Sequence, residues 1–209
     1  LSNLQRQIIH ETADVGKPKV ESAQESITRL NPDVKVIPYN HRLSAENALE
    51  IISEYDFIIE GTDNFPSKFL VNDACFFSGK PFSQGGILRF QGQTMTYSPG
   101  NACYRCVYES APPAGAVPTC SEAGVFGAIA GMLGTIQAAE AVKYLVGIGK
   151  PLTNRLLFFD ALDMSFRTVN VKKNPDCPIC GGNPTITTIE EYEQAVCEIP
   201  NPSTSGERA

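Results

Sequence analysis

The stretch that decides the fold is Asp56-Phe57-Ile58-Ile59-Glu60-Gly61-Thr62-Asp63-Asn64. Its first half is a compact apolar run of the kind that is buried on both faces in a parallel sheet. The patterns on both sides of it alternate between the helical and the strand period, which indicates an α/β layer architecture. Ligands of such sheets bind at the carboxyl ends of the strands. We therefore expect chemistry at Thr62, Asp63 and Asn64, which follow the strand directly.

The elements around this strand follow from residue spacing and turn residues. Val20, Ala23, Ile27 and Leu30 share one face of a helix over residues 19–30. Further helices are expected over 45–54, 67–78 and 125–146, and further strands over 34–39, 81–86, 91–97, 156–160 and 166–172. The last two strands read as a hairpin-like pair. The pattern predicts a Rossmann-like, mostly parallel sheet with a C-terminal antiparallel extension.

Composition narrows the class of protein. The chain has 209 residues, 42% of them hydrophobic and 19% charged, which fits one medium globular domain. A net charge of −6 and an isoelectric point of about 5.0 argue against a nucleic-acid partner. Seven cysteines without a signal sequence favour a reducing compartment, and we expect a cytoplasmic protein. The most apolar segment, 125–146, contains Gln137, Glu140 and Lys143, so we expect no membrane span.

Two cysteine couplets lie far apart in the chain, Cys103-Tyr104-Arg105-Cys106 and Cys177-Pro178-Ile179-Cys180. Each couplet places two thiolates on one tight turn, and two couplets complete the tetrahedral shell of a structural zinc ion. The alternatives are a redox dithiol at one couplet or two unrelated thiol pairs. A thioredoxin-like motif needs only one couplet, so the double pattern favours a four-cysteine zinc site.

Phosphate-binding groups are scattered through the first third of the chain. Arg6 follows a run of amide side chains, and Lys19 begins a predicted helix whose positive dipole end attracts anions. Asp63 supplies a carboxylate that could hold Mg²⁺. Two cations and one carboxylate are compatible with a triphosphate site, but they also fit a solvated loop and a helix that happens to begin with lysine.

Several motifs in register give a family resemblance. They are, in order, Ser2-Asn3-Leu4-Gln5-Arg6-Gln7, Gly16-x-Pro18-Lys19, Leu30-Asn31-Pro32, Gly61-Thr62-Asp63-Asn64, Arg89-Phe90-x-Gly92-Gln93 and the two cysteine couplets. The chain resembles the bacterial E1-like activating enzymes of the ThiF/MoeB/HesA group, and within it the molybdopterin-synthase and sulfur-carrier adenylyltransferases. The resemblance runs from Leu1 to about residue 195. It implies one adenylation domain over 1–200. The Pro, Ser, Thr and Gly composition of residues 201–209 predicts a disordered tail or linker after it.

The resemblance implies a defined reaction. Such an enzyme binds ATP and Mg²⁺ and adenylylates the C-terminal glycine of a ubiquitin-like sulfur-carrier protein that ends in diglycine. A sulfur donor, either a rhodanese or a cysteine desulfurase, then converts the adenylate to a thiocarboxylate. The pathway implied is molybdopterin, thiamine or thiolated-tRNA biosynthesis, and the implied assembly is a homodimer.

The matching positions imply roles for individual residues at the nucleotide. Ser2, Asn3 and Arg6 would contact the ribose and phosphates, and Lys19 would stabilise charge on the phosphates. Asp63, with Asn64 beside it, would hold Mg²⁺ or orient the attacking group.

The resemblance also implies a path for the carrier tail. Gly85 and Gly86 end a predicted strand, and glycines would let a narrow diglycine tail approach the backbone. Arg89 follows this glycine-rich strand, and we expect it to guide the tail.

Cys120 is a separate candidate. It lies in Pro118-Thr119-Cys120-Ser121, and some relatives use a cysteine here for a covalent bond to the carrier. A thiol on a loop before a helix N-terminus should have a lowered pKa and be reactive. The alternative is a partly buried loop cysteine without a covalent role.

The chain departs from the family at its beginning. The expected strand, Gly-x-Gly-x-x-Gly turn and second strand before Ser2 are absent, so we expect an incomplete sheet and weak ATP binding by these residues alone. The chain could be a fragment, a nicked protein or a truncated inactive relative. A zinc-stabilised module that docks a carrier without catalysis is therefore the second hypothesis. A nicotinamide-dependent oxidoreductase is the third, but it needs a dinucleotide turn and a paired Tyr and Lys that are not visible.

Overall fold

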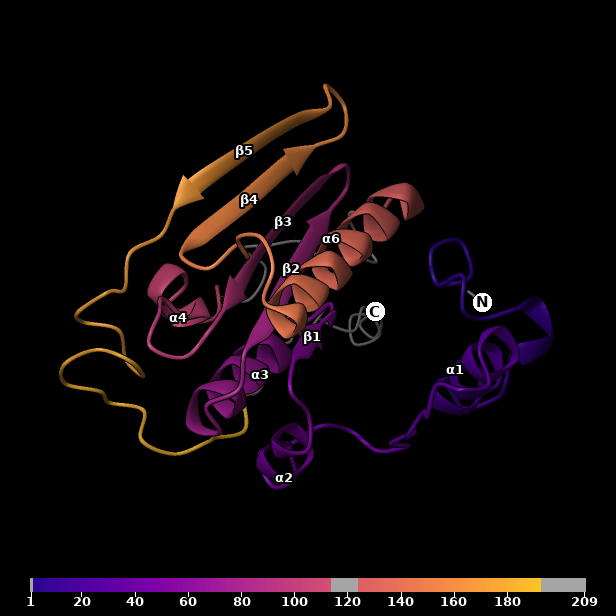
Figure 1. The fold of residues 1–209 in the computed structure, drawn as a ribbon, viewed down its shortest axis with the longest axis horizontal. Coiled ribbons are helices and arrows are strands. Elements are labelled where there is room, and N and C mark those ends of the chain that lie inside the picture. The colour runs from indigo at the N-terminus through magenta and orange to yellow at the C-terminus, as the bar shows by residue number, and fades with distance from the viewer. Residues whose placement is uncertain (1, 114–123, 193–209) are drawn as a thin grey trace, which may run out of the picture.

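The computed structural model describes residues 2–113 and 124–192. Its elements in chain order are η1 (Thr12–Asp14), α1 (Lys19–Leu30), α2 (Ala48–Ser53), β1 (Ile58–Glu60), α3 (Phe65–Phe77), β2 (Phe82–Leu88), β3 (Gln91–Tyr97), α4 (Tyr104–Val107), α6 (Gly127–Val146), β4 (Arg155–Asp160) and β5 (Ser165–Asn170). They form an α/β fold in which helices flank a central sheet, with the N-terminal helix α1 off to one side (Figure 1).

Five strands form one sheet in the order β1-β2-β3-β4-β5. β1 and β2 run parallel, while the other three neighbouring pairs are antiparallel. The C-terminal antiparallel extension is thus confirmed, but the described sheet is mixed rather than mostly parallel. The reason is local: only Arg89 and Phe90 join β2 to β3, and a two-residue connection can join antiparallel strands alone.

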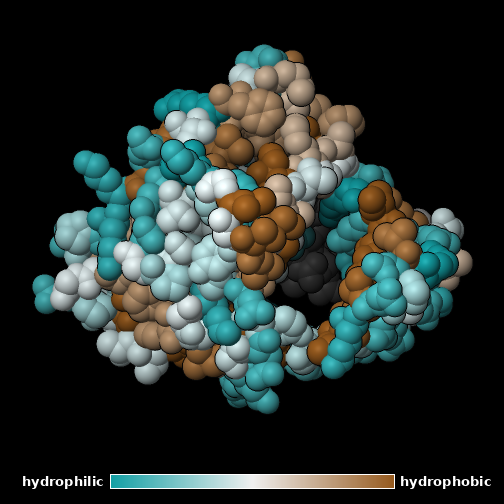
Figure 2. Space-filling view, viewed as in Figure 1, coloured by the Kyte–Doolittle hydropathy of each residue, from teal (hydrophilic) through white to brown (hydrophobic). Residues whose placement is uncertain are grey.

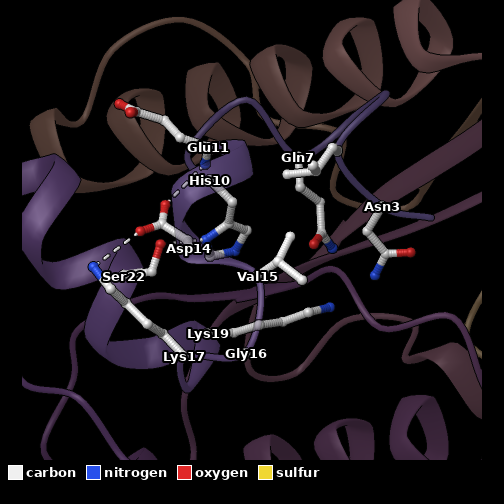
Figure 3. Close-up of a pocket in the computed structure, with 11 residues that line it drawn as sticks. Asn3, Gln7, His10, Glu11, Asp14, Val15, Gly16, Lys17, Lys19 and Ser22 are labelled. Atoms are coloured by element: carbon white, nitrogen blue, oxygen red, sulfur yellow. Dashed lines mark hydrogen bonds and ion pairs between the residues drawn. The ribbon is translucent and has the colours of Figure 1, made fainter. Parts of the chain in front are cut away.

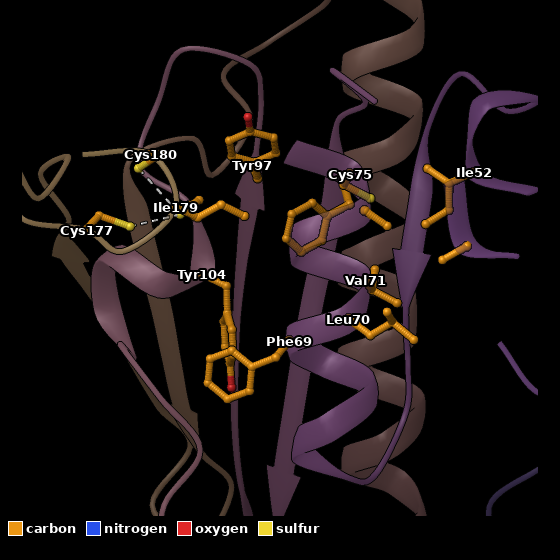
Figure 4. Close-up of a cluster of buried hydrophobic side chains, with 14 residues drawn as sticks. Ile52, Phe69, Leu70, Val71, Cys75, Tyr97, Tyr104, Cys177, Ile179 and Cys180 are labelled. Atoms are coloured by element: carbon orange, nitrogen blue, oxygen red, sulfur yellow. Dashed lines mark hydrogen bonds between the residues drawn. The ribbon is translucent and has the colours of Figure 1, made fainter. Parts of the chain in front are cut away.

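Helices α3 and α6 cover opposite faces of this sheet; in Figure 4, α3 lies in front of the strands and α6 behind them. Phe82 and Tyr97, paired across β2 and β3, belong to the core that α3 completes. Gly85 turns its α-carbon toward α6, where an added Cβ would lie 2.8 Å from Gln137 Oε1 and 2.9 Å from Leu133 Cδ2. The two-residue period of β2 therefore assigns alternate residues to the two helices.

The larger core lies on the α3 side. Helix α3 is buried over most of its circumference, as expected of a helix that is apolar on several faces. Cys75 belongs to this core, because its side chain is fully buried on α3. The buried members of this core are Ala48, Ile52, Phe69, Leu70, Val71, Ala74, Cys75, Phe82, Tyr97, Cys103, Tyr104, Cys177, Ile179 and Cys180. Cysteines from both couplets are thus part of the main core.

The strand predicted over 34–39 is wrong. These residues have no regular secondary structure, and Val34 and Ile37 are 46% and 48% exposed. β-Branched residues form a strand only where a neighbouring strand and a packing face are available. Here the segment instead leads from α1 to α2 as an extended connection (Figure 1).

Residues 2–30, which we call the N-terminal lobe, lie beside the main body with a hollow between them (Figure 2). The lobe touches the segment before α6 through Gln5, whose Nε2 donates to Val125 O at 3.2 Å. It carries exposed apolar side chains, among them Ile8 and Leu30, which are 96% and 86% exposed. Across the described ranges, none of the helices combines the length and apolar character that spanning a bilayer requires.

Candidate functional site

The two cysteine couplets meet in one cluster. The Sγ atoms of Cys103, Cys106, Cys177 and Cys180 all lie within 4.8 Å of one another. Cys103 Sγ is 3.9, 3.7 and 3.6 Å from the sulfurs of Cys106, Cys177 and Cys180 in turn. A tetrahedral shell with zinc–sulfur bonds of about 2.3 Å has sulfur–sulfur separations of roughly 3.8 Å. The cluster therefore has the donor set and spacing of a structural thiolate metal site.

Local geometry explains how each couplet forms its turn. The first couplet makes the short helix α4, and the Cys106 amide donates to Cys103 O at 3.0 Å. The second couplet is followed by Gly181, whose amide donates to Cys177 O at 2.9 Å. A Cβ on Gly181 would lie 2.5 Å from Pro175 O, so only glycine fits there. Each turn thus presents both of its sulfurs to the same point.

The surroundings of one sulfur of the cluster, that of Cys106, favour its thiolate form. Hydrogen bonds with the Cys103 and Cys177 thiols lower the pKa of Cys106 far below its ordinary value, aided by the backbone amide of Asn174. That amide lies 3.4 Å from Cys106 Sγ. The thiolate is the form that coordinates a metal. These contacts therefore favour ligation at Cys106.

The first couplet is locked to α3 by a buried ion pair. Arg105 Nε and Nη2 donate to the two carboxylate oxygens of Asp73 at 2.8 and 2.9 Å, in the bidentate geometry of strong pairs. Tyr192 OH donates to the same carboxylate at 2.6 Å. The guanidinium also lies over the Phe69 ring, 4.6 Å from its centroid. We call this assembly, together with the four cysteines, the cysteine region.

Thr62, Asp63 and Asn64 follow β1 at its carboxyl end, as predicted. Asn64 is the N-cap of α3, and its Oδ1 accepts the Ser67 amide at 2.9 Å. Its side chain is thus committed to the helix terminus. Asp63 is exposed, and within the described residues its carboxylate forms no hydrogen bond or ion pair. A free carboxylate beside a fixed N-cap is available to a cation or a substrate.

The predicted nucleotide residues of the N-terminal lobe lie together. Asn3 and Lys19 line one cavity of about 130 Å³ (Figure 3). Lys19 is the first residue of α1, follows Pro18 at the N-cap, and makes no ion pair among the described residues. Arg6 lies beside this cavity: its Nη2 donates to Asn3 Oδ1 at 3.1 Å and its Nη1 to Ser2 O at 3.5 Å. The lobe therefore gathers Ser2, Asn3, Arg6 and Lys19.

The same cavity also carries acidic groups. Asp14 and Glu11 line it with Lys19. The Glu11 backbone amide donates to Asp14 Oδ2 at 2.8 Å, and this bond, with further bonds from Ser22 and Lys17, lowers the pKa of Asp14 to about 2. Asp14 is therefore ionised at neutral pH, and its charge is partly balanced by Lys17 at 3.3 Å.

The predicted nucleotide residues come from two parts of the chain, the N-terminal lobe and the loop that follows β1. No hydrogen bond or ion pair joins Asp63 to Arg6 or Lys19 within the described ranges. Cys120 lies outside the described residues, so its role stays a prediction.

The structure gives Gly85 and Arg89 other roles beside the expected one. Gly85 packs closely against the side chains of α6, as described above. Arg89 has φ of 54° in the turn between β2 and β3, and its backbone bridges to Val125. These contacts describe the backbone at both positions, and the expected role of Arg89 in guiding a carrier tail stays a prediction.

Two buried ion pairs were not expected from the sequence. They are Asp73–Arg105 and Glu60–Lys68, with N···O separations of 2.8 and 2.7 Å. The available signal was an arginine inside a cysteine couplet and a lysine in an apolar helix. Such residues are rarely buried unless they are paired. Their partners lie in other elements, so spacing along the chain does not identify them.

Comparison with known proteins places this geometry in a family. The family model described as the ThiF family matches residues 1–179. The chain is 48% identical over 205 residues to the sulfur carrier protein adenylyltransferase of Thermus thermophilus, covering 95% of this chain and 75% of that protein. It is 45% identical over 200 residues to the SAMP-activating enzyme E1 of Haloferax volcanii, covering 95% and 74%. It is 42% identical over 194 residues to the adenylyltransferase and sulfurtransferase MOCS3 of Bos taurus, covering 92% and 43%.

Solved structures share the fold. The crystal structure of E. coli MccB with ATP matches with a TM-score of 0.70 and 21% identity, covering 86% of this chain and 55% of that one. MccB with MccA-N7isoASN matches with a TM-score of 0.74, also at 21% identity, and covers 86% and 56%. The likeness to MccB concerns the fold alone. Because the family model spans most of the sequence and curated relatives are 45 to 48% identical, the chain belongs to the ThiF family.

Proposed function

We propose that the chain carries out ATP-dependent adenylylation of the C-terminal glycine of a ubiquitin-like sulfur-carrier protein. The observation that carries the proposal is Lys19, a cation without an ion pair in the described residues, which begins α1 and shares a cavity with Asn3, the residue that accepts a hydrogen bond from Arg6. Relatives named sulfur carrier protein adenylyltransferase and SAMP-activating enzyme E1 support the reaction and the substrate class.

The proposed chemistry depends on positioning and on neutralising charge. The carboxylate of the carrier attacks the α-phosphorus of ATP and displaces pyrophosphate, which forms an acyl-adenylate. Lys19 and Arg6 balance negative charge that develops on the phosphates. Ser2 and Asn3 add hydrogen bonds to the ribose and phosphates. The N-terminus of α1 supplies further backbone donors beside Lys19.

Asp63 is proposed to hold Mg²⁺ or to orient the attacking group, and Asn64 to keep it in place as the N-cap of α3. The carboxylate is exposed and free to accept a cation. The carrier partner would end in diglycine, because a narrow tail can approach a crowded reaction centre. A rhodanese or a cysteine desulfurase would then supply sulfur for molybdopterin, thiamine or thiolated-tRNA biosynthesis.

The metal of the cysteine cluster is proposed to be Zn²⁺ with a structural role. Four sulfurs complete a tetrahedral shell, so no position remains for a substrate. Cysteines that are not paired in disulfides are typical of a reducing compartment, which supports a cytoplasmic setting. We also propose a homodimer and a single adenylation domain over 1–200.

Pyrophosphate exchange tests the proposed reaction. The chain is incubated with ATP, Mg²⁺, labelled pyrophosphate and a ubiquitin-like protein that ends in Gly-Gly. The expected result is label in ATP that depends on the carrier. The matched control is the same carrier without its two terminal glycines, which should abolish exchange. Absence of exchange with every intact carrier would contradict the proposal.

A carrier-docking module without catalysis is the second candidate function. The observation that favours it is that the cysteine cluster is assembled, whereas Asp63 is not joined to Arg6 or Lys19 in the described residues. Calorimetry, which measures carrier binding, and pyrophosphate exchange together separate the two candidates. Carrier binding without exchange supports the module, and exchange supports the enzyme.

A further inference from the structure

A buried ion pair lies directly behind the loop that carries Asp63. Glu60 is the last residue of β1 and is 2% exposed, and Lys68 lies one turn into α3. Lys68 Nζ donates to Glu60 Oε2 at 2.7 Å and to Gly85 O on β2 at 2.5 Å. The lysine therefore joins two neighbouring strands to the helix that follows the loop.

The other oxygen of Glu60 holds the loop itself. Glu60 Oε1 accepts the Thr62 amide at 2.7 Å and the Thr62 hydroxyl at 2.5 Å. On the far side of Asp63, Asn64 caps α3. Asp63 thus lies between two anchored neighbours. Its side chain is free, but its backbone is held from both sides.

The anchor is itself supported by α6. Gln137 Nε2 donates to the backbone oxygens of Glu60 and Ser83 at 2.8 and 3.0 Å. Gln137 is 3% exposed, so this bridge is part of the packed interior. The loop anchor therefore belongs to a frame that includes β1, β2, α3 and α6.

Burial of this charged pair is not explained by stability alone. Replacing a buried ion pair with well-packed apolar residues is often neutral or stabilising, because both charges lose their hydration. Polar groups that fix a reacting residue have another benefit, since a misplacement of about 1 Å can reduce the rate roughly 100-fold. The two bonds that Thr62 donates to Glu60 fix the residue next to Asp63, so they offer this positioning benefit.

We propose that Glu60 and Lys68 are positioning residues that hold the Thr62-Asp63 backbone in place for adenylylation. The proposal rests on the proposed function for its kinetic consequence. Its structural claim, that the pair fixes the loop, can be measured separately by amide exchange. Neither residue is expected to touch the nucleotide.

The first test compares two threonine-to-valine substitutions. Thr62→Val removes one hydroxyl bond to the buried Glu60. Thr96→Val makes the same change elsewhere, because Thr96 Oγ1 donates to buried Glu140 at 2.7 Å. In carrier-dependent pyrophosphate exchange, we expect Thr62→Val to lower kcat about tenfold with a nearly constant KM for ATP. Thr96→Val should keep kcat within about twofold of the original chain.

The second test removes the pair while keeping the interior packed. The double variant Glu60→Leu/Lys68→Met replaces both charges with apolar side chains. We expect a melting temperature close to that of the original chain, a roughly 100-fold lower kcat and an amide of Thr62 that exchanges about tenfold faster. Lys68→Met alone leaves a buried carboxylate unpaired and should melt earlier.

The outcomes separate the positioning claim from the proposed reaction. Original protection of the Thr62 amide in a folded double variant would overturn the positioning claim. So would an original kcat in that variant. If the unsubstituted chain shows no exchange at all, the proposed function fails. The amide measurement then still decides whether the pair holds the loop.

Discussion

The cysteine region and the N-terminal lobe carry the two groups of candidate functional residues, and they are built in opposite ways. In the cysteine region, sulfurs from two distant segments meet in the core, and Arg105 and Asp73 bind each other out of solvent. In the N-terminal lobe, Arg6 and Lys19 lie near the surface, and Gln5 bonds to the segment before α6. The comparison teaches that the candidate metal site is assembled by burial, while the proposed nucleotide site keeps its cations accessible.

Metal removal should give the largest effect on stability. A metal at 100 to 1,000 times its Kd stabilises the folded state by about 3–4 kcal/mol, so its removal should cost a similar amount. The measurement is thermal unfolding of metal-loaded and chelator-treated protein, with metal content determined in both. Amides between Cys103 and Cys180 should lose protection, whereas those of the N-terminal lobe should change little. An unchanged melting curve after verified removal would contradict a structural metal.

Breaking the Asp73–Arg105 pair should give the second-largest loss of stability. Asp73→Asn removes the charge that balances a buried guanidinium, and breaking such pairs costs roughly 3 kcal/mol. Chemical denaturation measures the free energy of unfolding. The matched control is Glu11→Gln, which breaks an exposed pair with Arg29 of 2.7 Å and should change stability by less than about 1 kcal/mol. Equal losses in the two variants would remove the contrast between the two regions.

Glycines of α6 offer a sharper test of the lobe contact. A Cβ on Gly127 would lie 2.4 Å from Gln5 O, whereas Gly131 and Gly134 have open space around their α-carbons. Gly131→Ala should stabilise the helix by up to about 1 kcal/mol. Gly127→Ala should show less of this gain and should expose the N-terminal lobe to limited proteolysis. Identical proteolysis of the two variants would mean that Gln5 does not hold the lobe.

Sequence reasoning succeeded where local spacing or the chemistry of a residue type carried the signal. The spacing in 19–30 predicted α1, and alternation predicted β3 over 91–97. The chemistry of four thiols predicted that distant couplets would meet, and they do. The segment 34–39 has strand-forming residues but no partner, so its propensity was misleading. The Asp73–Arg105 contact depends on how α4 packs against α3, and no spacing along the chain encodes that.

The contrast also predicts a substitution that affects activity without affecting stability. Lys19→Ala should lower kcat/KM for ATP at least tenfold, because the proposed phosphate-binding charge is lost, while the unfolding free energy stays within about 0.5 kcal/mol. Pyrophosphate exchange and denaturation measure the two quantities. Lys35→Ala, an equal change of charge at an exposed position, is the control. A loss of stability with Lys19→Ala would assign the residue a structural role.

The smallest effect should be the titration of Asp14. Its folded pKa of about 2 lies below the ordinary value of 3.8, chiefly because the Glu11 amide donates to the carboxylate. Its contribution to stability is therefore present above about pH 4 and is lost as the pH falls from about 4 toward 2. A carboxyl-resolved NMR titration should place the midpoint of Asp14 near 2. A midpoint near 3.8 would show that the Glu11–Asp14 turn is open in solution, and the lobe would then lack even its local order.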